Sequence, residues 1–158
     1  MTATDVRPDA TGQIDIAARP EYVYTLVSDP GVLAGLAAEY RGHRWLGGAT
    51  QAAVGARFLG RNKNGFQRWM TVATITDAED GARFAFDVTA GPIRSSRWQY
   101  DIEATDAGCR VTESTWDRRP GWLRTTAPLI TGVKDRAAHN QRNIEATLRA
   151  LKERAERG

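Results

Sequence analysis

Two polar residues of this chain are spaced so that a β-strand would turn them toward an apolar face. Glu113 follows Cys109 and Val111 at intervals of two residues, so on a strand it shares their face. The same alternation puts Asn62 on the face of Phe58. An unpaired carboxylate buried among apolar side chains costs several kcal/mol, so Glu113 needs a partner, a raised pKa or water beside it. A carboxyl group held in this way can give or take a proton.

Two interpretations of Glu113 stay open at this stage. In the first, it faces a water-filled cavity and is a catalytic acid or base toward a bound molecule. In the second, Trp98, Tyr100 or Asn62 satisfies it in a structural network, or the polar face of its strand lies outside. The sequence holds no motif of a serine hydrolase, a phosphate-binding loop or a zinc protease. With one cysteine and two histidines, it predicts neither a metal site nor a cofactor.

Aromatic residues are the second chemical signal, because five tryptophans are many for 158 residues. Rings of this kind suit a pocket that holds a flat or greasy ligand, although they more often form ordinary core. The alternation pattern selects these strand residues for a ligand-binding wall: Asn62, Trp69, Thr71, Phe86, Trp98, Tyr100 and Thr115. A slip of one residue in register would invert the choice, and the facing of residues 68–76 and of His43 is the least determined.

A long amphipathic helix, expected over residues 128–157, is the element that must cover this wall. Its apolar residues recur at spacings of three, four and seven: Ile130, Val133, Ala137, Ile144, Leu148, Leu151 and Ala155. We expect Ile130, Val133 and Ala137 to contact the ligand. The opposite, solvated face carries Lys134, Arg136, Arg142, Arg149, Lys152 and Arg154. The helical wheel also places His139 in solvent.

The rest of the chain alternates like an antiparallel sheet. A strand is expected over residues 12–18, followed by a helix that begins at Pro20 and a short apolar helix over 32–38, with Asp29-Pro30-Gly31 as a break between them. Six further strands, separated by turns such as Asn64-Gly65, are expected over 41–46, 56–62, 66–76, 83–90, 94–105 and 109–118. A curved sheet wrapped around the final helix buries one face of each.

Composition agrees with one soluble domain, which we place at residues 13–156 after a flexible N-terminus of residues 1–12. The net charge of +3 invites a nucleic-acid partner, but acidic residues interleave with the basic ones of the last helix, as on a solvated face. We therefore expect no nucleic-acid binding. The polar start of the chain predicts neither a signal peptide nor a membrane span, so a cytoplasmic monomer or homodimer is expected.

Local sequence adds a resemblance. Residues 14–24, followed by Ser28-Asp29-Pro30, resemble the start of proteins in the SRPBCC superfamily, which includes START lipid-transfer domains, the birch-pollen allergen and polyketide cyclases and dehydrases. Phe84-Ala85-Phe86, Trp98-Gln99-Tyr100 and Val111-Thr112-Glu113-Ser114 are similar to a branch frequent in actinobacteria. The likeness runs over residues 13–152, and its strength is in the order of the motifs rather than in any one of them.

The resemblance implies an α+β helix-grip fold: a seven-stranded antiparallel sheet wrapped around a long C-terminal helix, with two short helices after the first strand. It also implies a hydrophobic cavity for lipids, polyketides or other small molecules. Because members share no catalytic motif, no catalytic residue carries over. Three functions remain: a cofactor-independent enzyme of the cyclase or dehydrase kind that uses Glu113, a non-catalytic carrier or sensor, and a partner-binding module that uses the basic helix face.

Overall fold

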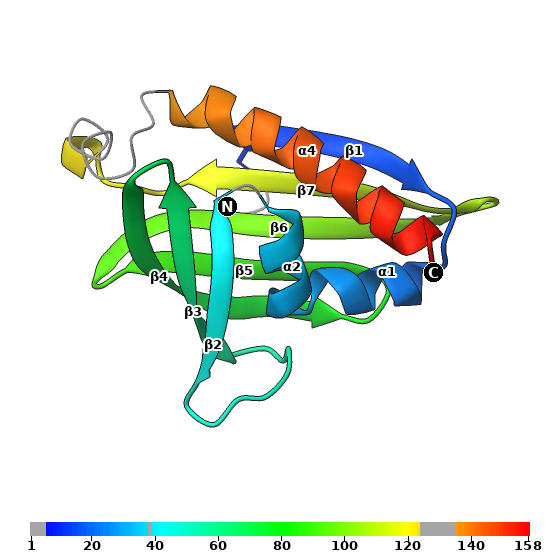
Figure 1. Ribbon diagram of the computed structural model, residues 1–158, viewed down its shortest axis with the longest axis horizontal. Coiled ribbons are helices and arrows are strands. Elements are labelled where there is room, and N and C mark those ends of the chain that lie inside the picture. The colour runs from blue at the N-terminus through cyan, green and yellow to red at the C-terminus, as the bar shows by residue number, and fades with distance from the viewer. Residues whose placement is uncertain (1–5, 38, 124–134) are drawn as a thin grey trace.

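The protein is one curved antiparallel sheet with a long helix packed across it (Figure 1). The computed structural model describes residues 6–37, 39–123 and 135–158. The strand order is β1-β7-β6-β5-β4-β3-β2, so only the pairing of β1 with β7 joins distant parts of the chain. This is the expected helix-grip architecture. The elements in chain order are β1 (Ala10–Ile16), α1 (Pro20–Val27), α2 (Pro30–Leu36), β2 (Tyr40–Leu46), β3 (Arg57–Asn64), β4 (Gln67–Glu79), β5 (Arg83–Ala90), β6 (Ile93–Thr105), β7 (Gly108–Asp117) and α4 (Arg136–Glu156).

The strands begin and end within a few residues of the sequence-based expectation, and β1 differs in an informative way. It begins at Ala10, so the segment that we expected to be a flexible N-terminus contributes residues 10–12 to the sheet. Two contacts outside the ladder hold the chain before it: Trp116 Nε1 donates to the Val6 carbonyl oxygen at 2.6 Å, and the Asp117 N–H donates to Asp9 at 2.7 Å. The segment before β1 is thus bound to β7 through the Val6 carbonyl group and the Asp9 carboxylate.

The two short helices follow β1 as expected, but the break between them is used differently. Asp29-Pro30-Gly31 does not merely end α1. Asp29 is the N-cap of α2, and its carboxylate accepts hydrogen bonds from the N–H groups of Gly31 (2.8 Å) and Val32 (3.4 Å). Pro30 is the first helical residue, where a missing N–H costs nothing. The tripeptide therefore starts the second helix, two residues earlier than predicted.

Helix α4 lies over β1 and β7, with its C-terminal part nearest α1 (Figure 1). Its apolar stripe packs as predicted from the middle of the helix onward: Ile144, Leu148, Leu151 and Ala155 are buried. Gly12 of β1 permits this approach, because a Cβ there would lie only 2.9 Å from Cγ2 of Ile144. None of the described helices is long and apolar enough to cross a membrane.

At the N-terminal end of α4 the predicted apolar stripe is not buried. The Gln141 side chain accepts from the N–H of Thr11 (3.1 Å) and donates to its carbonyl oxygen (2.8 Å), close to the residue where β1 begins. Ala137 lies one turn before Gln141 and is exposed, because the helix there has passed the end of that strand. Residues 128–134 of the predicted helix lie outside the described residues.

Candidate functional site

A cavity of about 350 Å³ lies between the inner face of the sheet and α4. Its volume falls within the range of ordinary ligand pockets. The strands turn mostly apolar side chains toward it, and α4 adds polar ones. Seven of the residues selected from the alternation pattern line it: Asn62, Trp69, Thr71, Phe86, Trp98, Tyr100 and Glu113. The inward facing chosen for Trp69 and Thr71 is therefore the one in the structure, although exposed Met70, which lies between them, also borders the cavity.

Glu113 is the most unusual group in the wall, because it is a carboxyl only 2% exposed. It sits in the middle of β7 between Gly12 of β1 and Tyr100 of β6, which are its partners in the ladder. The Tyr100 hydroxyl donates to Oε1 at 2.8 Å, whereas Oε2 has no hydrogen-bond partner among the described residues. One oxygen is thus held in place by Tyr100, and the other is buried in the cavity wall without a hydrogen-bond partner among the described residues.

Burial also controls the protonation of this pair. Removal from water raises the pKa of Glu113 from 4.5 to about 8, and the hydrogen bond from Tyr100 opposes this rise. Burial, followed by the nearby carboxyl, raises the pKa of Tyr100 well above its ordinary value. Near neutral pH the phenol therefore remains a donor and most Glu113 carboxyl groups carry their proton. Both open interpretations of Glu113 contain a correct part: it lines a cavity, and it is hydrogen-bonded to Tyr100.

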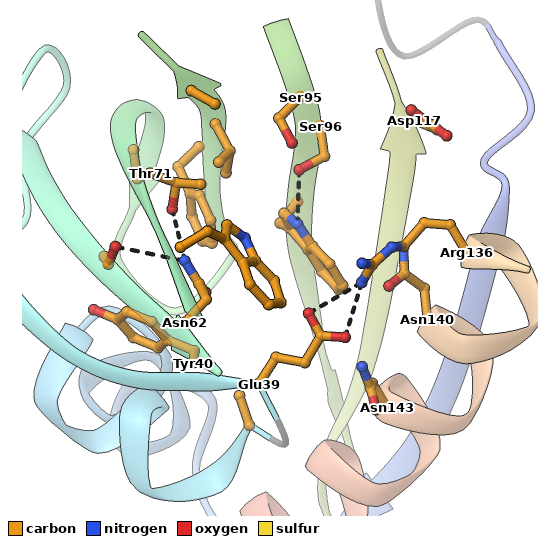
Figure 2. A pocket seen from close by; sticks show the side chains of 18 of the residues that line it. Glu39, Tyr40, Asn62, Thr71, Ser95, Ser96, Asp117, Arg136, Asn140 and Asn143 are labelled. Atoms are coloured by element: carbon orange, nitrogen blue, oxygen red, sulfur yellow. Dashed lines mark hydrogen bonds and ion pairs between the residues drawn. The ribbon is translucent and has the colours of Figure 1, made fainter. Parts of the chain in front are cut away.

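Asn62 belongs to a different part of the wall, on β3. Its amide nitrogen donates to Thr71 Oγ1 at 3.1 Å, a bond that joins β3 to β4 (Figure 2). The same nitrogen donates to the Gly60 carbonyl oxygen, within β3, at 3.5 Å. Among the described residues no hydrogen bond joins it to Glu113. The Trp98 indole N–H, also in the wall, donates to the Ser96 hydroxyl at 3.1 Å. These bonds fix the orientation of an amide and an indole that face the cavity.

The mouth of the cavity contains a charged group that the sequence did not predict. Glu39, just before β2, accepts from Arg136 Nη1 through both carboxylate oxygens at 2.8 and 3.0 Å (Figure 2). The Arg136 guanidinium lies 6.0 Å from the centre of the Trp69 ring, within cation–π range. His139 Nε2 also contacts Glu39 Oε1. Both Arg136 and His139 were expected in solvent, and that expectation is wrong because the first turns of α4 face Glu39.

The other predicted residues lie elsewhere. Thr115 is on the inner face but does not border the cavity; it is 1% exposed and its hydroxyl donates to the Arg97 carbonyl oxygen at 2.9 Å. Ala137 is exposed and does not line the cavity, for the reason given above. Ile130 and Val133 lie outside the described residues. The His43 ring packs against Gly31 of α2 and beside Trp45, away from the cavity wall.

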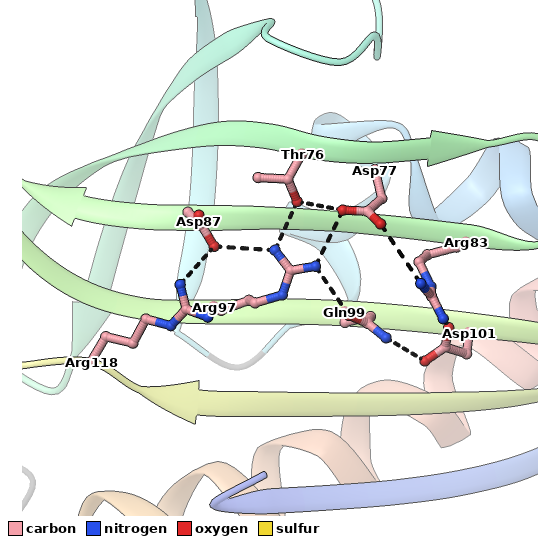
Figure 3. A network of polar contacts seen from close by, with 8 residues as sticks. All are labelled: Thr76, Asp77, Arg83, Asp87, Arg97, Gln99, Asp101 and Arg118. Carbon is pink, nitrogen blue, oxygen red and sulfur yellow. Dashed lines mark hydrogen bonds and ion pairs between the residues drawn. The ribbon is translucent and has the colours of Figure 1, made fainter. Parts of the chain in front are cut away.

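A second set of charges lies on the opposite face of the sheet (Figure 3). Arg97 alternates with the inward-facing Trp98, so its side chain points away from α4. It is 6% exposed and donates to Thr76 (2.8 Å), Asp77 (3.2 Å), Asp87 (3.3 Å) and Gln99 (3.1 Å). This set, which we call the outer network, joins β4, β5 and β6 and has no access to the cavity. Within the described residues, no cluster of histidine, cysteine and acidic side chains could hold a metal ion.

Comparison with known proteins gives a family and several similar folds. The family model described as polyketide cyclase/dehydrase and lipid transport matches residues 7–156. The solution structure of a Polyketide_cyc-like protein from Corynebacterium glutamicum is 27% identical, covers 92% of this chain and 90% of its own, and has a TM-score of 0.61. No curated protein matches the chain.

Two further solved structures share the fold at lower identity. A crystal structure of a Chromobacterium violaceum protein is 15% identical, with a TM-score of 0.68 over 92% of this chain and 96% of that one. The di-domain ARO/CYC protein StfQ from the steffimycin biosynthetic pathway is 12% identical, with a TM-score of 0.71 over 93% of this chain and 50% of that one.

Proposed function

The chain belongs to the polyketide cyclase/dehydrase and lipid transport family, and from this premise we propose that its cavity binds a hydrophobic small molecule and that Glu113 acts on an oxygen atom of that molecule. The ligand is polyketide-, lipid- or aromatic-like. The apolar wall formed by Phe58, Phe86 and Val88 and the two cavity tryptophans supports binding of this kind. Glu113 supplies the polar group that fixes orientation.

The observation that carries the proposal is a buried carboxyl in the cavity wall with one oxygen that has no hydrogen-bond partner among the described residues. Because burial raises its pKa to about 8 and Tyr100 donates to Oε1, Glu113 near neutral pH would carry its proton on Oε2, from which a small rotation of the side chain would direct it to a ligand. A carbonyl or hydroxyl oxygen of the ligand would satisfy this donor. Desolvated donors bind such oxygens more strongly than exposed ones do, because water does not compete.

The same carboxyl could catalyse a dehydration or cyclisation without a cofactor. In its ionised form, Glu113 would remove the proton from the carbon beside a ligand carbonyl. In a dehydration it would then return this proton to the departing hydroxyl, so that a C–H and a C–O bond break, a C=C bond forms and water leaves. The carboxylate is thereby restored. General acid–base catalysis by a positioned carboxyl contributes roughly 10²- to 10⁴-fold to a rate.

The experiment is to compare Glu113→Gln with the wild-type protein on a set of β-hydroxy ketones and poly-β-ketones. Glutamine keeps the acceptor for Tyr100 and the shape of the neutral acid but cannot exchange a proton. We expect the variant to bind these compounds and to lose their conversion. Glu103→Gln, the same change at an exposed position of β6, is the matched control and should convert them normally.

Other outcomes would decide between the remaining functions. If wild-type protein binds the compounds and returns them unchanged, and Glu113→Gln alters only affinity, the protein is a carrier or sensor. If neither protein binds any hydrophobic compound, the proposal is wrong. The partner-binding alternative gains no support from Lys152 of α4, because this cation is already bound within the protein. Its Nζ donates to the Asp15 carbonyl oxygen of β1 at 2.8 Å and to Glu156 of the same helix at 2.7 Å.

A further inference from the structure

Arg136 at the mouth of the cavity stands where a helix disfavours a cation. It is the first residue of α4, and a positive charge there opposes the positive N-terminal end of the helix dipole. Its ion pair with Glu39 and its stacking on Trp69 offset this cost. The side chains of the pair are only 16% and 15% exposed. Arg136 therefore depends on an anionic partner at this place.

More hydrogen-bond donors converge on this place than Glu39 uses. Both oxygens of Glu39 contact a single nitrogen of Arg136, and the other guanidinium nitrogens make no hydrogen bond to the described residues. Asn140, 7% exposed, and Asn143 also line the cavity, and within the described part of the chain their amides have no side-chain hydrogen bond. Positions 136, 140 and 143 share one face of α4, and Figure 2 shows all three side chains directed from the helix into the cavity that the Glu39 carboxylate enters.

The charges of the cavity wall indicate what could replace Glu39. Among the described residues of the wall, the ionised side chains form two pairs: Glu39 with Arg136, and Asp117 with Arg119, whose Nη2 and Nε nitrogens donate to the carboxylate at 2.7 and 2.9 Å. Within this described set the charges therefore balance while Glu39 occupies the mouth. A bound carboxylate that took its place would keep that balance and could use the unused donors of Arg136, Asn140 and Asn143 as well.

We propose that Glu39 holds the place of a ligand carboxylate and that the ligand is a hydrophobic carboxylic acid, with its acid group on Arg136, Asn140 and Asn143 and its apolar body against the tryptophan-lined wall. This inference rests on the proposed function, since it specifies the class of molecule in the same cavity. Exchange requires only that the Glu39 side chain turn toward solvent. Its backbone stays fixed, because the Glu39 carbonyl oxygen accepts from the Lys63 N–H at 2.8 Å.

The test is to titrate the protein with decanoate and with decanol, which share one chain length and differ in charge, and to follow the fluorescence of the cavity tryptophans. Glu39→Gln removes the competing charge and keeps the side-chain size. We expect this variant to bind decanoate about fivefold more tightly than wild type, the factor that corresponds to the upper range for an ion pair in contact with water, and to bind decanol equally well. Decanoate affinity should also fall as salt is added, whereas decanol affinity should not.

Arg136→Gln is the second variant and should abolish the preference of Glu39→Gln for decanoate when the two changes are combined. If decanol binds but Glu39→Gln leaves the affinity for decanoate unchanged, the carboxylate subsite is refuted and the hydrophobic cavity of the proposed function stands. If neither compound binds to any of these proteins, both the subsite and the proposed function fail. Circular dichroism of each variant verifies that the fold is retained during these titrations.

Discussion

Replacing Glu113 by glutamine is expected to change how the stability of the fold depends on pH. In the folded protein this carboxyl is buried and its pKa is raised from 4.5 to about 8, whereas in the unfolded chain water surrounds it. The native state therefore holds a proton that the unfolded state releases at lower pH. Stability that derives from this difference is fully present below about pH 4.5 and is lost as the pH rises through about 8.

The size of the effect follows from the shift. One pKa unit corresponds to about 1.36 kcal/mol, so a rise from 4.5 to about 8 amounts to an upper limit of about 5 kcal/mol in the free energy of unfolding. A typical domain is stable by only about 5–15 kcal/mol. Release of this single proton on unfolding therefore weakens the fold substantially as the pH rises from about 4.5 to about 8. The glutamine variant, which has no proton to lose, escapes this loss.

Urea unfolding, followed by tryptophan fluorescence, measures the effect. Wild type, Glu113→Gln and the exposed control Glu103→Gln would be unfolded at intervals from about pH 5 to about pH 9. From pH 5 to about pH 8 the unfolding free energy of wild type should fall relative to that of Glu113→Gln by several kcal/mol, and the difference should level off between about pH 8 and pH 9. Glu103→Gln should follow wild type throughout, because its carboxyl is solvated in both states.

Parallel stability curves for wild type and Glu113→Gln would refute the reasoning. Such curves would mean that Glu113 binds its proton equally well in the folded and unfolded states, and hence that water reaches it in the cavity. The assignment of Glu113 as a neutral donor at pH 7 would then fall as well.

Four further substitutions test other parts of the structure. Tyr100→Phe removes the donor to Glu113 Oε1, which should cost about 1–3 kcal/mol in urea unfolding and raise the pKa of Glu113 further, as an infrared titration of the carboxyl band would show. Gly12→Ala should lower stability by about 1–3 kcal/mol, because its new methyl group would meet α4 at 2.9 Å, whereas Gly35→Ala, in an exposed helix position with nothing within 4 Å, should raise stability by about 0.5–1 kcal/mol in the same assay. Asp29→Ala removes the cap of α2 and should lower the stability by about 1 kcal/mol, and an unchanged melting temperature would show that the cap is redundant.

The inner face of the sheet was predictable because alternation along a strand is a local property. Once Phe58 was taken as buried, Asn62 on the same strand had to face the same way, and the paired strands follow the same rule. The apolar stripe of α4 was equally predictable over Ile144 to Ala155, where the helix lies on the sheet. In both places one buried face determines the orientation of every other residue.

The mouth of the cavity was not predictable in this way. Glu39 and Arg136 are 97 positions apart, and neither lies in a pattern that indicates the other. A helical wheel assigns Arg136 to solvent because it has no information on where the sheet ends. No local signal was available either, because a helix expected from residue 128 has Arg136 in its interior; only the structure makes Arg136 the first residue of α4, where a cation is electrostatically unfavourable. Thr115 was missed for the same reason. Alternation correctly predicted that it faces inward, but it could not predict that other parts of the chain bury the residue away from the cavity.

The outer network has a consequence for how such a protein can change over evolution or in the laboratory. Because Arg97 and its four partners tie β4, β5 and β6 together from the side that faces away from the cavity, these contacts do not involve the side chains that line the interior. We expect residues such as Trp69, Phe86 and Trp98 to be exchangeable for a new ligand while the outer contacts continue to align the strands. Stability and specificity are assigned to opposite surfaces of the same three strands.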